Sequence, residues 1–261
     1  MLIVKYRNHG IKLAHVWFAT TQDIVDRSYK LQKADIYYLH GISADSIGGG
    51  YLLTKQNSLI KDLSLSEDEM FNTLGKSLRK HIKKSERDGL VKIEFYDSEE
   101  ILKNTTLLST GKHLYEKMKS DKGIGGSFNT ALAIEYCKAN ALMCGLATIE
   151  ANPVGFCAVI YHQENSRAWV GAFDFRGGEY DTHIMSNAHR ELNWKRMLWL
   201  KEHGVREFDF GGIDSFEKPN GVSLFKMEFE QNNKITYNNF LVPGSLLGRA
   251  AVKYFLYRGR D

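Results

Sequence analysis

The sequence predicts a mixed α/β (α+β) fold, in which helices pack on strands around an apolar core. The 261 residues are 43% hydrophobic and 25% charged, a balance that allows the chain to bury one good core or two small ones. Apolar residues recur at helical spacing in some segments and alternate at strand spacing in others. In the second half, a helix, three strands, a long helix and a further strand are expected in that order.

The first half is expected to begin with strands around residues 14–19, 35–40 and 51–60, interrupted by the turn-rich Ser43–Gly50. A helix should follow, because Ser66 and Glu69 form a capping box and apolar residues then recur at helical spacing. We expect this helix to continue without interruption to Asp88-Gly89. A strand over 91–96 and a second helix capped by Ser98 complete this half, before the glycine-rich connector at 121–126.

The second half is expected to start with a helix over 129–140. Three strands should follow at 142–149, 154–161 and 168–175, with Asn152-Pro153 marking the first turn between them. The remaining pattern predicts a helix over 182–203, strands at 207–210 and 235–242, and a terminal helix after Pro243.

The most informative segment runs from Gly204 to Phe229. Gly204 is expected to end a helix, and Phe208 and Phe210 should point inward from a short strand with Asp209 on the other face. Gly211 and Gly212 then open the backbone, where a ligand can approach. A lysine follows on an otherwise apolar segment, between Phe225 and Phe229, and burying this cation is costly unless an anion or a reacting carbonyl meets it.

The pattern G-x-x-x-F-D-F-G-G followed by F-K-x-x-F resembles the Fem-type (FemA/FemX-like, FemAB family) acyltransferases of the GNAT superfamily. The helix beginning at Leu78-Arg79 resembles the helix that leads into the acyltransferase half of those proteins, so that the similarity spans roughly two-thirds of the chain. It implies a GNAT-like acyltransferase fold. Residues 1–97, with a basic helix at 66–88, would form a reduced N-terminal GNAT-like lobe, residues 98–242 the acyltransferase lobe, and residues 243–261 a helix packing back on the first lobe.

The resemblance also implies functions for particular residues. Lys226 of the F-K motif would neutralise the oxygen of the donor carbonyl, although a lysine in this position can equally extend to solvent. Asp209 would orient the substrate amine or accept its proton; alternatively, its carboxylate caps the glycine turn by bonding the backbone of Gly211. Arg79 would grip a phosphate of the substrate, as one of several cations on an otherwise solvated helix face. The remaining expected substrate-binding residues are Gly211, Gly212 and Phe225.

By resemblance, the chain is an enzyme that transfers an acyl or aminoacyl group to an amine of a peptidoglycan or polysaccharide precursor. The donor would be aminoacyl-tRNA or acyl-CoA as a co-substrate, with no tightly bound cofactor and no metal. A nucleotide-sugar and a lipid-linked amine are the two kinds of acceptor that the resemblance allows. The junction Arg176–Thr182 lacks the turn that binds CoA in GNAT enzymes, and Glu179 and Asp181 add negative charge there, which favours tRNA. The alternatives are an acyl-CoA-dependent N-acetyltransferase of an amino sugar or small amine, and an inactive Fem-like binding module.

The net charge, the cysteines and the distribution of apolar residues indicate what kind of partner and what cellular location to expect. The formal net charge of +4 mildly favours an anionic partner, and the three scattered cysteines are typical of core thiols. Without a bilayer-spanning apolar run or the layout of a signal peptide, a cytoplasmic location is expected, with the inner face of the membrane as an alternative place of action. The terminal helix mixes cations with aromatic residues, which suits an anionic membrane surface, but docking against the first lobe explains the same pattern and is preferred.

Overall fold

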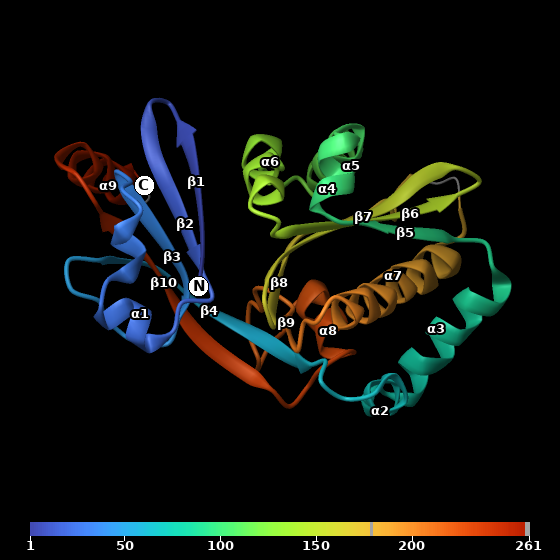
Figure 1. The fold of residues 1–261 in the computed structure, drawn as a ribbon. Coiled ribbons are helices and arrows are strands. Elements are labelled where there is room, and N and C mark those ends of the chain that lie inside the picture. The colour runs from blue at the N-terminus through green and yellow to red at the C-terminus, as the bar shows by residue number, and fades with distance from the viewer. Residues whose placement is uncertain (178–179, 259–261) are drawn as a thin grey trace. The chain divides into compact units, whose positions relative to one another are not determined.

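The computed structural model describes residues 1–177 and 180–258. The chain divides into two compact units (Figure 1). Unit 1 comprises Met1–Ser58, Gly212–Lys218 and Lys234–Asp261, and unit 2 comprises Leu59–Gly211 and Pro219–Asn233. Both the helix pair that follows residue 66 and the strand at 92–96 therefore belong to unit 2, and the expected lobe of residues 1–97 does not coincide with either unit.

Unit 1 is a sheet with helices on both faces. Its elements are β1 (Leu2–Asn8), β2 (Ile11–Trp17), α1 (Thr21–Val25), the 3₁₀-helix η1 (Ser28–Leu31), β3 (Ile36–Ile42), most of β4 (Tyr51–Asp62), β10 (Lys234–Pro243) and α9 (Leu246–Arg258). Strand β2 pairs antiparallel with β1 and parallel with β3, and β3 pairs antiparallel with β10. One core of this unit surrounds Tyr29 and Tyr37, and another joins α9 to the sheet.

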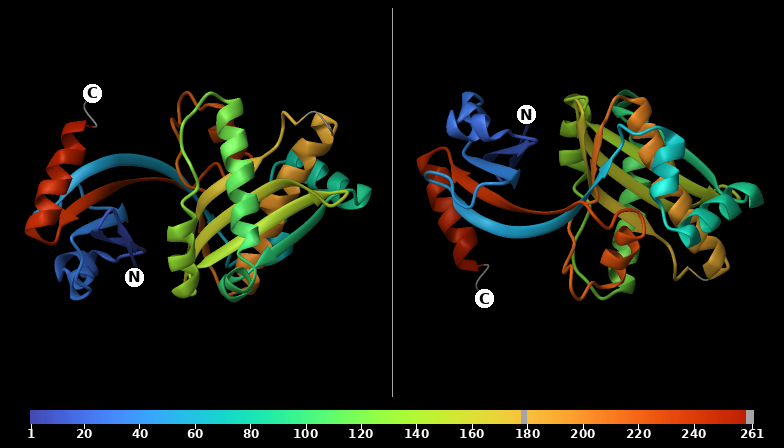
Figure 2. Two further views of the ribbon diagram at one scale, coloured as in Figure 1. Left: turned by 90° about the horizontal axis from the view of Figure 1, so that it is seen from above. Right: turned by 90° about the horizontal axis from the view of Figure 1, so that it is seen from below.

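Unit 2 is a larger sheet with helices on both faces (Figures 1 and 2). Its elements are the end of β4, α2 (Glu67–Thr73), α3 (Lys76–Asp88), β5 (Lys92–Tyr96), α4 (Ser98–Lys103), α5 (Thr106–Asp121), α6 (Thr130–Lys138), β6 (Leu142–Ile149), β7 (Asn152–His162), β8 (Asn165–Phe173), α7 (Thr182–Glu202), β9 (Glu207–Asp209) and α8 (Gly221–Met227). Strands β5 to β8 form an antiparallel meander. Strand β9 adds parallel to β8, and β4 adds antiparallel to β9.

The two faces of the unit 2 sheet carry different helices. Helix α7 covers one face, where Met185, Ala188 and Leu192 pack on residues of β6, β7 and β8, and α3 packs on α7. Helices α4, α5 and α6 pack on the other face (Figure 1). The long connection through α7 is what makes β9 parallel to β8, and this arrangement positions the C-terminal ends of both strands at the same edge.

Three sequence-based expectations were wrong in detail. The helix expected from 66 to 88 is two helices, because Leu74 is extended (φ −72°, ψ 145°) and Gly75 serves as the N-cap of α3. The helix expected from Ser98 is also two helices, α4 and α5, separated at Asn104-Thr105. Strand β1 was not expected at all.

Two local assignments also change. Asp97, rather than Ser98, caps α4 through a capping box with Glu100. The Ser98 hydroxyl instead donates to the carbonyl of Leu142 (2.8 Å) and accepts from its amide (3.0 Å). The turn before β7 lies at Glu150-Ala151, both with positive φ, and Pro153 lies within the strand opposite a register shift.

Candidate active site

The candidate site begins where β8 and β9 stop pairing. The parallel register ends at Arg167↔Asp209, and β8 then continues to Phe173 while β9 has ended. Gly211 follows with φ +74°, a conformation that side chains disfavour, and a Cβ at this position would lie 3.0 Å from the carbonyl oxygen of Ala168. Because glycine has no Cβ, the chain can turn away from β9 at Gly211 while it stays close to the backbone of β8.

Asp209 is held by two partners on unit 2. Its Oδ1 accepts from the amide of Gly211 at 2.7 Å, which is the turn-capping contact that the sequence offered as one alternative. Its Oδ2 accepts from Nη1 of Arg167, and both side chains are largely buried, with 13% and 10% exposed. Sequence analysis missed Arg167; the only available signal was a single arginine in the apolar run Ser166–Val170.

Lys226 lies in the last turn of α8 and faces this turn. Asn220 caps the helix by accepting from the amide of Ser223 (2.9 Å), which fixes where the helix begins. The Nζ of Lys226 lies 3.8 Å from the position that a Cβ on Gly211 would take. The lysine therefore points into the protein and does not extend to solvent.

Burial lowers the pKa of Lys226 to about 8. The carboxylate of Asp209 acts in the opposite direction, and the guanidinium groups of Arg167 and Arg196 lower the pKa further. At pH 7 the amine is therefore mostly protonated, yet it loses its proton little more than one pH unit higher. Arg196, which sequence analysis also missed, is buried over the ring of Phe208 (4.6 Å) and donates to Asn193.

Phe225 packs against α7. Its ring stacks on His189 with centroids 4.1 Å apart and planes 3° from parallel, and it makes an edge contact with Phe229 at 5.4 Å. Burial, followed by the charges of Arg196 and Arg190, lowers the pKa of His189 to about 3, so this histidine is neutral at pH 7. The contacts of Phe225 in the structure thus fix α8 on α7.

The structure does not bring Arg79 to Lys226. Arg79 lies on α3, and its Nη1 donates to the side chain of Asn72 at 3.0 Å. Helix α3 is attached to α7 by the contact of His81 Nδ1 with Asn187 Oδ1 (2.8 Å). Gly212, the remaining predicted residue, belongs to unit 1, where a Cβ would lie 2.5 Å from the side-chain nitrogen Nε2 of Gln56.

The N-terminus of α7 is occupied by a carboxylate. Asp181 is the N-cap, and its Oδ1 accepts from the amides of His183 (2.8 Å) and Ile184 (3.4 Å). These amides are the groups that would bind a diphosphate at this junction. Glu179, the second acid expected here, lies outside the described residues.

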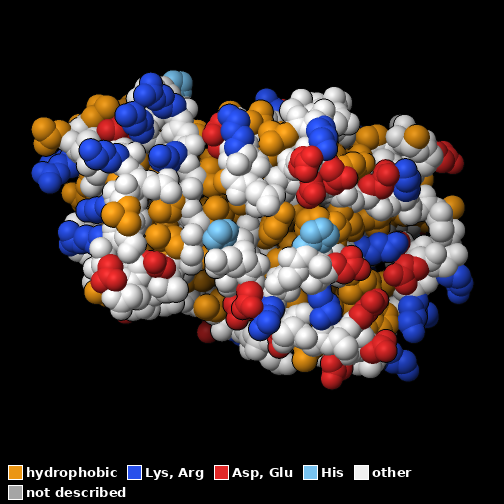
Figure 3. All heavy atoms as spheres, viewed as in Figure 1, with side chains coloured by type: hydrophobic (Ala, Val, Ile, Leu, Met, Phe, Trp, Pro, Cys, Tyr) orange, Lys and Arg blue, Asp and Glu red, His pale blue; other side chains and the backbone are white. Residues whose placement is uncertain are grey.

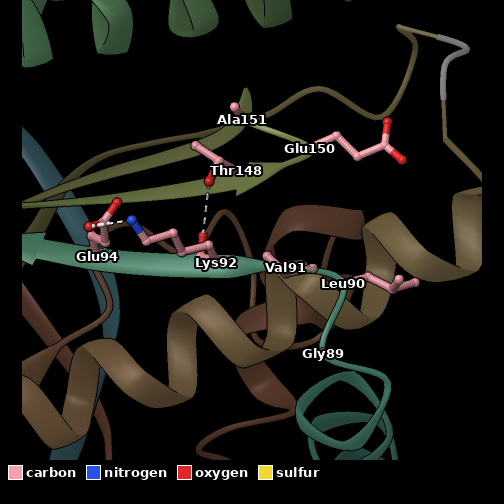
Figure 4. Close-up of a pocket in the computed structure, with 8 residues that line it drawn as sticks. All are labelled: Gly89, Leu90, Val91, Lys92, Glu94, Thr148, Glu150 and Ala151. Carbon is pink, nitrogen blue, oxygen red and sulfur yellow. Dashed lines mark hydrogen bonds and ion pairs between the residues drawn. The ribbon is translucent and has the colours of Figure 1, made fainter.

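A cavity of about 560 Å³ lies at the edge formed by β5 and the β6–β7 turn (Figure 4). Lys92 and Glu94 form an ion pair along one side of it (2.8 Å), with Thr148 and Glu150 on the other. None of the predicted site residues lines this cavity.

Three further properties concern the whole described chain. Over residues 1–177 and 180–258, no group of three or more His, Cys, Asp and Glu side chains is arranged to hold a metal ion. In the same residues, no helix combines the length and apolar character needed to cross a membrane. Cys137, Cys144 and Cys157 are buried and free, as predicted.

No protein-family model and no curated protein sequence matches the chain. Solved structures do match it over nearly its full length. FemX has a TM-score of 0.61 and 12% identity, covering 92% of this chain and 83% of that protein. The C-terminal domain of a putative lysylphosphatidylglycerol synthetase from Agrobacterium fabrum has a TM-score of 0.55 and 13% identity, covering 96% and 83%. L-PGS from Bacillus licheniformis has a TM-score of 0.50 and 11% identity, covering 99% and 86%.

At these identities the similarity is one of fold. The mixed α/β fold class predicted from the sequence is confirmed, and the fold is like that of FemX. A similarity of fold does not show what any individual residue does.

Proposed function

We propose that the chain is an acyltransferase that joins an acyl or aminoacyl group to an amine of a cell-envelope precursor. The observation that carries the proposal is the desolvated ammonium of Lys226 at the end of the β8–β9 pairing, next to the glycine turn. Its support from the comparisons is the fold, which is similar to those of FemX, of a domain whose name includes lysylphosphatidylglycerol synthetase, and of L-PGS.

The chemistry requires a cation where the carbonyl oxygen gains charge. When an amine attacks an ester or thioester carbonyl, an N–C bond forms and the carbonyl oxygen becomes negative. The C–O or C–S bond then breaks, the leaving group departs with its electron pair, and the proton lost by the amine ends on the departing alcohol or thiol. In this proposal, Lys226 donates a hydrogen bond from its ammonium to that oxygen. A partly desolvated ammonium interacts with a developing anion more strongly than a hydrated one, because less water screens the two charges.

Asp209 supports this role as a positioning residue. Both of its oxygens already accept hydrogen bonds, from Gly211 and Arg167, so it is better suited to hold the turn than to remove a proton from the acceptor amine. Its negative charge also raises the pKa of Lys226 and so keeps the lysine protonated at neutral pH.

The proposed donor is an aminoacyl-tRNA. The carboxylate of Asp181 takes the first amides of α7, which leaves them less able to bind the diphosphate of CoA. Arg79 is proposed to contact a phosphate of the acceptor, as its place in the family motif implies. In that case Arg79→Ala should raise KM several-fold with little change in kcat, whereas its exposed neighbour variant Lys80→Ala should change neither.

A reconstituted transfer assay tests the donor and the reaction together. The purified protein is incubated with an amine-bearing peptidoglycan precursor and either charged tRNA or acetyl-CoA, and the product is identified by mass spectrometry. We expect an amide product with charged tRNA that disappears after ribonuclease treatment. Transfer from acetyl-CoA that resists ribonuclease would replace this donor by acyl-CoA. No transfer from either donor to a broad amine panel would contradict the enzyme proposal and favour a binding module.

A further inference from the structure

Helix α9 is apolar on both of its faces, although only one of them packs on the sheet of unit 1. Val252 is fully buried in a core with Leu13, Ile36 and Leu241. Gly248 brings the helix so close that a Cβ there would lie 1.8 Å from the carbonyl oxygen of Asp35. The docking expected from the sequence therefore accounts for this inner face alone.

The opposite face of α9 is exposed and also apolar. At 100° per residue, five positions fall within an arc of roughly 100°. These positions, called here the outer face of α9, are Leu246, Leu247, Ala250, Tyr254 and Tyr257. Leu246 is 81% and Tyr257 75% exposed, and Leu247 and Tyr254 exceed half. Scattered exposed leucines are ordinary, but a contiguous apolar face of this kind marks an interaction surface.

The charges around this face are positive. Arg249 and Lys253 are exposed and lie along one border of the outer face, and residues 246–258 include no acidic side chain. Unit 1 as a whole has 13 lysines and arginines against 7 acidic residues, whereas unit 2 has 22 against 24. The basic character of the chain thus belongs to unit 1. Figure 3 shows Lys and Arg side chains interspersed with hydrophobic ones over the region of α9, β1 and β2.

We propose that the outer face of α9 docks on the surface of an anionic phospholipid bilayer. Leu246 and Leu247 would enter the boundary between headgroups and acyl chains, where tyrosine rings such as that of Tyr257 are also favourable. Arg249 and Lys253 would face the phosphates of the headgroups, where each cation adds attraction. The proposed partner is the surface of the bilayer, on which α9 would lie without crossing the membrane.

Charge favours a lipid surface over a second copy of the chain. Two copies meeting through α9 would bring two basic units together, and their like charges would repel. An anionic bilayer instead satisfies both the apolar outer face and its basic border. The proposal does not depend on acyl transfer, and it can fail or succeed independently of the proposed function.

Vesicle flotation tests the proposal with the full chain. The protein is mixed with extruded vesicles of phosphatidylcholine alone or with 30 mol% phosphatidylglycerol, and the bound fraction is measured after flotation at low and at physiological salt. We expect binding to the anionic vesicles, at least tenfold weaker binding to the neutral ones, and a decrease with salt.

Two variants and a matched control locate the surface. Leu246→Ser/Tyr257→Ser removes apolar contact, and Arg249→Glu/Lys253→Glu reverses the border charge; each should lower binding about tenfold or more. All four side chains are exposed, so circular dichroism should remain that of the wild type. Lys80→Glu/Lys84→Glu on α3 changes the total charge equally and should retain most of the binding.

Three outcomes would overturn the proposal. Equal binding to neutral and anionic vesicles would remove the role of charge. A loss in the α3 control as large as in the α9 variants would show attraction by total charge and not by this helix. A dimer by light scattering that dissociates in Leu246→Ser/Tyr257→Ser would assign the outer face to a second copy.

Discussion

Two opposing influences act on the charge of Lys226. Burial disfavours its charge, whereas Asp209 favours it, and the resulting pKa of about 8 lies well below that of a lysine in water. A lysine in this state serves a reaction that needs a cation near neutral pH, because it is charged but poorly hydrated.

The lowered pKa of Lys226 predicts a pH dependence of stability. Between about pH 8 and the ordinary lysine pKa of 10.5, the unfolded chain holds a proton on this lysine that the folded chain has lost, so stability from this group rises with pH in that window. From pH 7 to pH 9, wild type should gain about 1 kcal/mol relative to Lys226→Met. Urea unfolding of both proteins at the two pH values measures this, and a parallel response would show that Lys226 has an ordinary pKa.

Gly211 predicts a backbone effect. Gly211→Ala forces a side chain into positive φ and toward the carbonyl of Ala168, which should lower the free energy of unfolding by about 1–2 kcal/mol and displace Lys226. Gly221→Ala is the matched control, since it adds the same methyl group in α8 with nothing within 4 Å and should be neutral or stabilising. Equal effects of the two substitutions on urea unfolding would contradict this reading of Gly211.

Some contacts of the site residues could be predicted from the sequence, and others could not. The contact between Asp209 and the amide of Gly211 is local, and it was foreseen as an alternative because an aspartate two residues before a glycine turn commonly makes it. Arg167 and Arg196 reach the site only through the β8–β9 register and the packing of α7. No spacing in the sequence indicates such contacts.

At the scale of elements, the segment after α8 is fixed by a buried ion pair. Lys61 of β4 donates to Glu230 (3.4 Å), to the carbonyl of Phe229 (3.1 Å) and to the hydroxyl of Thr73 (2.7 Å). Glu230 Oε1 in turn accepts from the backbone amides of the next three residues. The end of the helix that carries Lys226 is thereby attached to β4 and α2.

Removing Lys61 should therefore be severe. In Lys61→Met, Glu230 remains buried without its cation, and we expect a loss of about 3 kcal/mol or more, measured by urea unfolding. The double variant Lys61→Met/Glu230→Gln, which removes both charges, should recover much of that loss. A single variant as stable as wild type would show that the pair does not hold this segment.

The helices that sequence analysis extended too far show the limit of periodicity. Phe71, Leu74 and Leu78 lie at helical spacing, yet the chain is extended at Leu74 and restarts at Gly75. Leu74 is buried in that extended conformation, so its burial is gained by tertiary packing and does not require a continuous helix. Elements with strong local signals, such as the long α7 between Asp181 and Gly204, were predicted within one or two residues.

At the scale of the molecule, the two units are assembled from separated segments of sequence. Unit 1 gains its last strand, β10, and α9 from residues after 233, which are far in sequence from the segments that they contact. Sequence analysis expected the helix after Pro243 to return to the first lobe, but it placed the strand that is β10 in the other lobe. Because of the same return, the excess of Lys and Arg over acidic residues lies in unit 1. The net charge of +4 for the whole chain does not show this uneven distribution.

The central claim, that Lys226 assists acyl transfer, is tested most directly by single-turnover rates of wild type and Lys226→Met with the donor identified in the reconstituted assay. We expect the rate of the variant to fall about 100-fold or more at pH 7 while circular dichroism and the thermal midpoint stay close to those of wild type. The wild-type rate should also lose its lysine-dependent part above about pH 8, where Lys226 is deprotonated. A folded variant that transfers at the wild-type rate would contradict the claim.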